Sequence, residues 1–356
     1  MPWALPVTNA LIMNQTPTPT TFFEIALVRS TRRRSRSNPK RQDLWKRFGK
    51  PNIMISKSGR HTMTDHDFVD THVHFWERPH DTLTWAWLAE DFTHPQLGRT
   101  RYLKDMSRYT ADEYLTDVKD SSVSKAVHIQ AAIGSEDPVE ETRWLQEMAD
   151  TTGCPQAIVG DARLQDPDVE SVIARHCEYS NFRGMRDFAE GDYLVDENFH
   201  RGYALLEKYD LVYDLDVFWE NMHKAAAMAK KFPNIVLVVD HSGFPQERTL
   251  EYFWNWRAGL AEFIGLDNVY IKISGLGMGD QMAGREWTLE TIRPWVESCF
   301  EVFGIERSFF GSNWPVDRMY SSYAQLIEAY RELVSDFSSD EQKALFSSNA
   351  ERVYRI

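Results

Sequence analysis

The chain has 356 residues, 42% of them hydrophobic and 26% charged, with a formal net charge of −13 at pH 7. No stretch reaches the roughly 18 uninterrupted apolar residues of a membrane helix, so we expect no membrane association. The three cysteines are too widely spaced for a zinc or redox motif, which favours a reducing compartment and a cytoplasmic location.

Charge divides the chain into two parts. Residues 1–62 hold 12 Lys or Arg against 2 Asp or Glu, so residues 63–356 carry a net charge of −23. A body this acidic repels phosphate, which excludes nucleic acid as its partner. The basic part is either a disordered leader that results from an upstream start codon, with Met63 as the natural start, or a targeting segment. Its Arg- and Ser-rich composition suits a mitochondrial transit peptide, and a nuclear address or nucleic-acid patch is the remaining alternative.

From residue 68 onward, short runs rich in β-branched and aromatic residues alternate with longer amphipathic runs. The eight predicted strands are residues 68–75, 125–132, 156–164, 182–188, 211–218, 235–243, 269–277 and 307–315. From the second strand on they recur at about the length of one βα unit. We therefore predict an α/β fold, a single-domain (β/α)8 TIM barrel over residues 63–356, because an open sheet would carry a glycine-rich loop after its first strand.

The first and second strands are separated by an insertion, residues 76–124, that is longer than a connection requires. Insertions of this length often cover the active site of a barrel. We expect Trp85 to bind an apolar part of a substrate, together with Trp87, although both could instead pack between helices.

The active site of a barrel lies at the carboxyl ends of its strands. His72 and His74 end the first strand and, at positions i and i+2, point to the same side. His241 ends the sixth strand, so three imidazoles can meet as ligands of one divalent ion, zinc or manganese. A site that works without a metal, with a histidine as base, remains the alternative.

Other polar residues at the strand ends suit substrate binding. Gln130 closes the second strand, and Lys272 in the seventh is either an inward cation or an outward one. Arg183 and Arg186 are three residues apart on the fourth strand, so we expect only one of them to reach the mouth and bind a carboxylate. Asp214 and Asp216 share one face of the fifth strand, although aspartates at strand ends commonly cap helices.

The motifs HVHFW, RGMR, DHSG, KISGL and GSNWPV, in this order, resemble the amidohydrolase superfamily. They are most similar to its lactone-hydrolase branch, related to fuconolactonase and 2-pyrone-4,6-dicarboxylate lactonase, over about residues 66–356. The resemblance implies a TIM barrel that hydrolyses a ring ester. It also implies that His72, His74 and His241 line the site, and that Arg183 or Arg186, with Lys272, binds the anionic groups of the substrate.

Two positions depart from the family pattern. The fifth strand lacks the usual histidine, as in the lactonase branch, and Asn313 replaces the aspartate of GSDWP that is expected to act as base. An amide cannot accept the proton of water, so Asp317 or one of the histidines would have to do so.

We therefore expect an enzyme that opens a small carboxylated or polyhydroxylated lactone, with that anionic molecule as its partner. A homo-oligomer is common for such barrels. Two alternatives remain, namely a metal-dependent aromatic-acid decarboxylase of the same superfamily and a catalytically silent ligand-binding barrel.

Overall fold

The structure, a computed structural model, describes residues 66–94, 100–189, 191–282, 284 and 286–356. The basic segment, residues 1–62, lies outside these ranges, so its proposed roles stay predictions. In the part of the chain that is described, no helix combines the length and the apolar character needed to cross a membrane.

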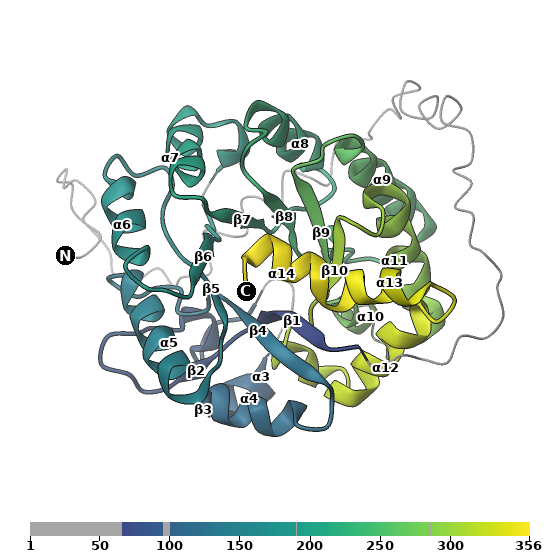
Figure 1. Ribbon diagram of the computed structural model, residues 1–356, viewed down its shortest axis with the longest axis horizontal. Helices are drawn as coiled ribbons and strands as arrows, with labels where there is room; N and C mark the ends of the chain where they lie inside the picture. The colour runs from purple at the N-terminus through teal and green to yellow at the C-terminus, as the bar shows by residue number, and fades with distance from the viewer. Residues whose placement is uncertain (1–65, 95–99, 190, 283, 285) are drawn as a thin grey trace, which may run out of the picture. The chain divides into compact units, whose positions relative to one another are not determined.

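Eight parallel strands form one sheet in which each strand pairs with the next in chain order (Figure 1). They are β1 (Phe68–Val73), β4 (Val123–Ile129), β5 (Ala157–Gly160), β6 (Phe182–Met185), β7 (Val212–Leu215), β8 (Leu237–Val239), β9 (Val269–Ile273) and β10 (Ser308–Phe310). Seven of them lie within a predicted strand, and β4 begins two residues before the predicted start at Lys125. The predicted (β/α)8 barrel is confirmed.

The barrel closes between its first and last strands with few backbone contacts. Val73 forms a single bridge with Trp314, and the backbone NH of His74 donates to the Trp314 carbonyl at 2.9 Å. Side chains supply the rest of the closure. The Asp70 carboxylate accepts hydrogen bonds from the backbone NH of Ser312 at 2.8 Å and from its hydroxyl at 2.6 Å.

The same carboxylate joins two helices to this seam. The hydroxyls of Tyr114 and Tyr323 donate to Asp70 Oδ2 at 3.0 and 2.9 Å. Gly311 allows the two strands to approach, because a Cβ at this position would lie 2.7 Å from Thr71 Oγ1. The Thr71 hydroxyl in turn donates to the Phe310 carbonyl at 2.8 Å.

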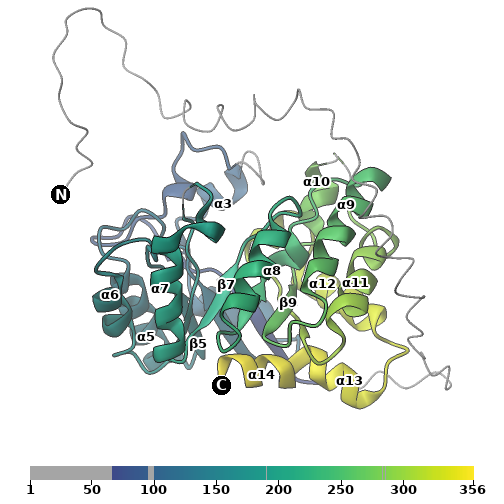
Figure 2. The same ribbon diagram turned by 90° about the horizontal axis from the view of Figure 1, so that it is seen from above.

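Helices surround the sheet (Figures 1 and 2). Those of the ring are α4 (Ala111–Val118), α5 (Val139–Thr152), α6 (Val169–His176), α7 (Glu197–Lys208), α8 (Met222–Lys231), α9 (Leu250–Leu260), α11 (Leu289–Phe303) and α12 (Tyr323–Leu333). The shorter ones are α10 (Gly277–Met282), α13 (Ser339–Lys343) and α14 (Asn349–Tyr354). Local signals set the ends of α5 and α11. Gly153 ends α5 with a φ of 78°, and Thr288 caps the first turn of α11 through the NH of Thr291.

The interior of the barrel, toward the end at which the strands begin, is an apolar core. Inward side chains of the strands, including Val69, Ile129, Val159 and Val238, pack against one another and against α14. This last helix crosses the end of the barrel at which the strands begin (Figure 1, yellow). The active site must therefore lie at the opposite end, as in other barrels.

The insertion after β1 folds into a small unit of its own. β2 (Trp76–Glu77) pairs in antiparallel fashion with β3 (Arg108–Tyr109), and α3 (Arg101–Asp105) lies between them in the chain. The Trp76 indole NH donates to the Met106 carbonyl at 2.8 Å, which fixes the insertion against its own strand pair.

Candidate active site

Two histidine rings face each other at the end of β1. His72 and His74 are buried, and their Nε2 atoms are 3.1 Å apart with the ring planes at 80°. Their spacing in the strand places both side chains on one side. Two imidazole nitrogens at this distance must share a proton or a metal ion, because two facing lone pairs repel each other.

A hydrogen bond fixes the tautomer of His74. Its Nδ1 lies 2.9 Å from the backbone carbonyl oxygen of Ile129, at the end of β4. A carbonyl oxygen only accepts, so Nδ1 carries the proton and Nε2 of the neutral ring presents its lone pair toward His72. His74 is therefore oriented as a metal ligand or as an acceptor of a proton.

The third histidine reaches this pair through an uncommon backbone conformation. The four residues from His241 to Phe244 all have positive φ, between 49° and 68°, and only Gly243 among them lacks a Cβ. A left-handed residue with a Cβ costs about 1 kcal/mol or more. The turn brings the His241 ring centroid to 4.3 Å from that of His72.

Residues after β9 hold His241 in place. Its Nδ1 lies 2.9 Å from Ser274 Oγ. The next residue, Gly275, has a φ of 61°, and a Cβ there would lie 2.8 Å from the same nitrogen. Glycine is required at 275 for both reasons.

All three imidazoles are neutral near pH 7. Burial lowers the pKa of His241 to about 3. Burial also holds the pKa of His72 well below its usual value, with His241 as a further cause, and does the same for His74 with Arg186 as the next cause. Neutral imidazole is the form that binds a metal ion.

The donor set fits a divalent ion chemically. Each Nδ1 has a neighbour that orients its ring, namely Ile129 for His74, Asp240 for His72 and Ser274 for His241, an arrangement common around metal sites. Across the described ranges, no three His, Cys, Asp or Glu side chains already converge as a metal cluster. His72, His74 and His241 are the residues that would hold the ion.

A buried ion-pair cluster adjoins His72. Lys272 Nζ contacts Asp214 Oδ1, lies 2.9 Å from Asp240 Oδ1 and is 3.4 Å from His72 Nδ1. The three charged side chains have no exposed surface, and Asp214 also accepts from the Tyr354 hydroxyl of α14 at 2.9 Å. Lys272 thus points inward, as one alternative predicted, but it is sealed between carboxylates rather than open to substrate.

Asp240 is the site residue that sequence reasoning missed. Burial alone would raise the pKa of Asp240, but Lys272 and His72 outweigh it and hold the pKa well below its usual value. Asp240 therefore stays ionised beside His72 Nδ1, 3.5 Å away. Its position directly before His241 in the DHSG motif is the feature of the sequence that could have indicated Asp240 as a site residue.

Arg186 is the arginine that reaches the mouth. It donates from Nε and Nη2 to Gln130 Oε1, at 3.0 and 2.6 Å, and from Nη2 to the Gln130 carbonyl at 2.8 Å. The Phe188 ring, 48% exposed, covers the guanidinium at 4.9 Å. Nη1 lies 3.7 Å from Oδ2 of both Asp216 and Asp240. Gln130 and Arg186 thus form one unit of the site.

The structure does not bring Arg183 to the other residues. Its guanidinium donates to the carbonyls of Ser180 and Phe182, at the beginning of β6, and its charged neighbour is Arg355 beyond α14. Arg183 therefore lies near the closed end of the barrel. The two arginines are three positions apart in the chain, which is enough to place them at different levels of the barrel.

Asn313 and Asp317 form a separate pair after β10. The Asn313 amide donates from Nδ2 to Asp317 Oδ1 at 2.8 Å, and both side chains are buried. Burial raises the pKa of Asp317 to about 8, although the Asn313 hydrogen bond opposes this. Asp317 thus contacts Asn313, and its raised pKa allows its carboxyl to hold a proton near neutral pH.

Of the two tryptophans in the insertion, Trp87 lies nearer to the histidines. Its ring centroid is 6.4 Å from that of His74, and its indole NH donates to the Ala131 carbonyl at 2.8 Å. Trp85 is 3% exposed, donates to the Phe75 carbonyl and packs on Trp144. The structure therefore places Trp85 in the packing of the insertion, which was the alternative interpretation.

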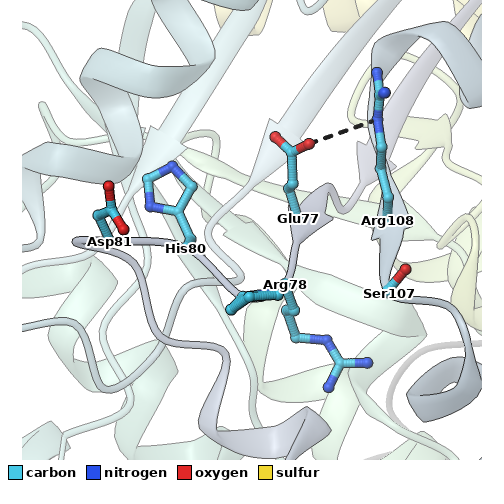
Figure 3. Close-up of a pocket in the computed structure, with 7 residues that line it drawn as sticks. Glu77, Arg78, His80, Asp81, Ser107 and Arg108 are labelled. Carbon is cyan, nitrogen blue, oxygen red and sulfur yellow. Dashed lines mark ion pairs between the residues drawn. The ribbon is translucent and has the colours of Figure 1, made fainter.

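A hollow of about 460 Å³ lies on the insertion itself (Figure 3). Its lining residues are Glu77, Arg78, Pro79, His80, Asp81, Ser107 and Arg108. The Arg78 guanidinium donates to the carbonyls of Leu88, Lys104 and Met106, and Glu77 pairs with Arg108 at 3.9 Å. These side chains hold the insertion together, and the hollow contains none of the predicted site residues.

Comparison with known proteins agrees with this geometry. A family model described as amidohydrolase matches residues 69–356. The uncharacterized protein y4mH of Sinorhizobium fredii is 33% identical, over 83% of this chain and 100% of that protein. An L-fucono-1,5-lactonase of Burkholderia multivorans is 30% identical, over 81% of this chain and 96% of the lactonase.

Solved structures agree as well. A crystal structure of an amidohydrolase from Burkholderia multivorans with bound zinc is 27% identical, with a TM-score of 0.70 over 82% of this chain and 99% of that chain. A 5-carboxyvanillate decarboxylase from Novosphingobium aromaticivorans, complexed with manganese, shares the fold with a TM-score of 0.60 at 15% identity, over 83% and 100% of the two chains. Because the family model matches most of its length, the chain belongs to the amidohydrolase family.

Proposed function

We propose that this protein hydrolyses a small lactone that carries a carboxylate or several hydroxyl groups. The observation that carries the proposal is the arrangement of His72, His74 and His241, neutral and buried, at the open end of the barrel. The similarity to an L-fucono-1,5-lactonase supports a sugar-acid lactone as the substrate class.

The polar groups around the histidines suit such a substrate. Arg186 is fixed by Gln130 through three hydrogen bonds, and its Nη1, 3.7 Å from Asp216 and Asp240, is thereby held in position to meet a hydroxyl or carboxylate of the substrate. The exposed Phe188 ring on the guanidinium offers an apolar surface to the carbon skeleton. A ring ester needs little more, because it is already more reactive than an open ester.

A divalent ion is consistent with the site. The zinc-bound relative supports zinc, and His72, His74 and His241 are the residues that would hold the ion. Such an ion would polarise the lactone carbonyl and lower the pKa of a bound water. Without it, the same residues still orient substrate beside the His72–His74 pair.

The decarboxylase alternative has one specific support, the shared fold with a manganese-containing 5-carboxyvanillate decarboxylase. At 15% identity this likeness extends to the fold alone, whereas the lactonase similarity extends through 81% of the sequence. We therefore rank lactone hydrolysis first.

One experiment separates the candidate functions. The full chain, purified with and without added zinc or manganese, is offered L-fucono-1,5-lactone, other aldonolactones, 2-pyrone-4,6-dicarboxylate and 5-carboxyvanillate. Proton release on ring opening indicates hydrolysis, and CO2 release indicates decarboxylation. We expect proton release with a lactone and its loss in His74→Asn. Ligand binding without turnover of any compound would establish the silent barrel instead.

A further inference from the structure

Asn313 follows the last strand, where the resemblance implies an aspartate base, and an amide cannot accept a proton from the attacking water. We propose that the group that accepts this proton is Asp216, at the end of the fifth strand. The inference rests on the proposed lactone hydrolysis and assigns the residue that activates water in that reaction.

The position of Asp216 suits this role. It follows the last residue of β7, and its side chain is 20% exposed, whereas Asp214 and Asp240 are fully buried. Oδ2 faces Arg186 Nη1 at 3.7 Å. Oδ1 is buried and accepts no hydrogen bond from the residues that the structure describes. A buried carboxylate oxygen without a donor is costly unless a ligand or water meets it during function.

Asp216 is connected to the histidines through a single guanidinium. Arg186 Nη1 lies 3.7 Å from Asp216 Oδ2 and equally far from Asp240 Oδ2, and Asp240 Oδ1 is 3.5 Å from His72 Nδ1. A substrate bound on Arg186 therefore lies beside the Asp216 carboxylate. This places the carboxylate within reach of a water that attacks the substrate.

The other acids near the site are less suited. Asp214 contacts Lys272 and accepts from Tyr354, and Asp240 lies between Lys272, His72 and Arg186. Both also have carboxylate oxygens without a hydrogen-bond donor among the described residues, but neither side chain has any exposed surface through which a water could approach. Asp317 is directed at Asn313 and is 2% exposed.

The charges around Asp216 allow it to exchange a proton near neutral pH. Burial raises the pKa of Asp216 to about 7, and the negative charges of Asp240 and Asp214 raise it further. The positive charges of Arg186 and Lys272 act in the opposite direction and lower the pKa. Tyr193, after β6, also faces this carboxylate, whose charge helps to raise the pKa of the phenol. A general base is most effective when its pKa lies near the working pH.

The reaction then balances without another reactant. Asp216 takes one proton from water while the water oxygen bonds to the lactone carbonyl carbon. The ring C–O bond breaks as the intermediate collapses, and the proton passes from the Asp216 carboxyl to the departing ring oxygen. The product is the open hydroxy acid, and Asp216 is ionised again.

The test compares four variants of the full chain, three of them isosteric Asp→Asn changes, on the lactone that the wild type opens. We expect Asp216→Asn to lower kcat by about 100-fold or more, with KM within about threefold, because a base contributes roughly 10²–10⁴-fold. Asp216→Glu should retain part of the activity and shift the acid limb of the kcat/KM profile. Asp161→Asn, at the partly buried residue directly after β5, should stay within a few-fold of the wild type and serves as the matched control. Asp317→Asn tests the rival base that the sequence offered, and it should lose far less activity than Asp216→Asn.

Three results overturn the inference. These are near-normal kcat in Asp216→Asn, an equal loss in Asp161→Asn, and a loss in Asp317→Asn alone. Infrared titration gives a readout without substrate. Several buried carboxyls, Asp214 and Asp317 among them, also have a pKa raised to about 7 or 8, so the carboxyl band that titrates near neutral pH should be smaller by one group in Asp216→Asn than in the wild type. If no lactone is hydrolysed, the proposed function fails, and an unchanged band in this variant separately rejects Asp216.

Discussion

The side-chain amide of Asn313 donates a hydrogen bond to the carboxyl of Asp317, four residues later in the chain, at 2.8 Å. This pair follows β10, where the resemblance to lactone hydrolases implies an aspartate in place of Asn313. The Asn313 amide therefore serves as a donor to a buried acid.

Replacing Asn313 by Asp should destabilise the protein at alkaline pH. Two carboxyls would then stand where a donor and an acceptor stand now, and they cannot both ionise at this distance. We expect a melting temperature that is close to the wild type at pH 5 and clearly lower at pH 8, measured by circular dichroism. The double variant Asn313→Asp/Asp317→Asn, which exchanges donor and acceptor, should recover most of the loss. No recovery in the double variant would contradict the pairing.

Asp317 itself should make stability fall as pH rises. Its pKa, raised to about 8 by burial from an ordinary 3.8, lies above that of the unfolded chain, so the folded state binds the extra proton. This contribution to the free energy of unfolding is fully present below about pH 4. It decreases as the pH rises from about 4 to about 8, by at most about 1.4 kcal/mol per pH unit. Urea denaturation at pH 5, 6.5 and 8 should show a shallower decline in Asp317→Asn. Parallel curves for both proteins would rule out the raised pKa.

His74 allows metal binding to be separated from stability. In His74→Asn the amide can still donate to the Ile129 carbonyl, but the Nε2 that faces His72 is gone. We expect elemental analysis of protein prepared with zinc to give about one ion per wild-type chain and far less in the variant, with a similar urea midpoint. His223→Asn, on the exposed face of α8, is the control and should keep its metal. Equal zinc in all three proteins would place the ion elsewhere.

Arg183 of β6 and Arg186, directly after this strand, should behave oppositely. Arg183→Ala removes bonds to backbone carbonyls at the closed end, so we expect a small loss of stability, about 1 kcal/mol, and an unchanged KM. Gln130→Glu places a carboxylate on Arg186, which competes with an anionic substrate. Its KM should rise about tenfold for a carboxylated lactone and much less for a neutral one. A rise of KM in Arg183→Ala would refute this division of roles.

The order of the strands and the histidine pair could be predicted because both follow from simple periodicity. The βα period locates each strand, and alternation along β1 places His72 and His74 on one side. The same alternation separates Arg183 from Arg186. It could not tell which of them reaches the mouth, because this depends on where along the barrel the strand begins.

Asp240 shows why the remainder could not be predicted. In a regular strand, Asp240 and His241 would point to opposite faces, so only one of them would belong to the site. The left-handed turn that begins at His241 breaks the alternation and allows both residues to contact the surroundings of His72. Such a turn of residues with Cβ atoms is held by tertiary contacts, such as the one to Ser274, which the sequence around it does not reveal.

The closure of the barrel between β1 and β10 links the thermal stability of the protein to its catalytic activity. The Asp70 side chain joins β1 to Ser312, just after β10, and β1 also carries His72 two residues further on. Fraying of this seam on heating would displace the histidine before the other strand pairs separate. We therefore expect the enzyme to lose turnover at a lower temperature than the one at which its helices melt, and amides at the seam to exchange with deuterium sooner than those between β4 and β5.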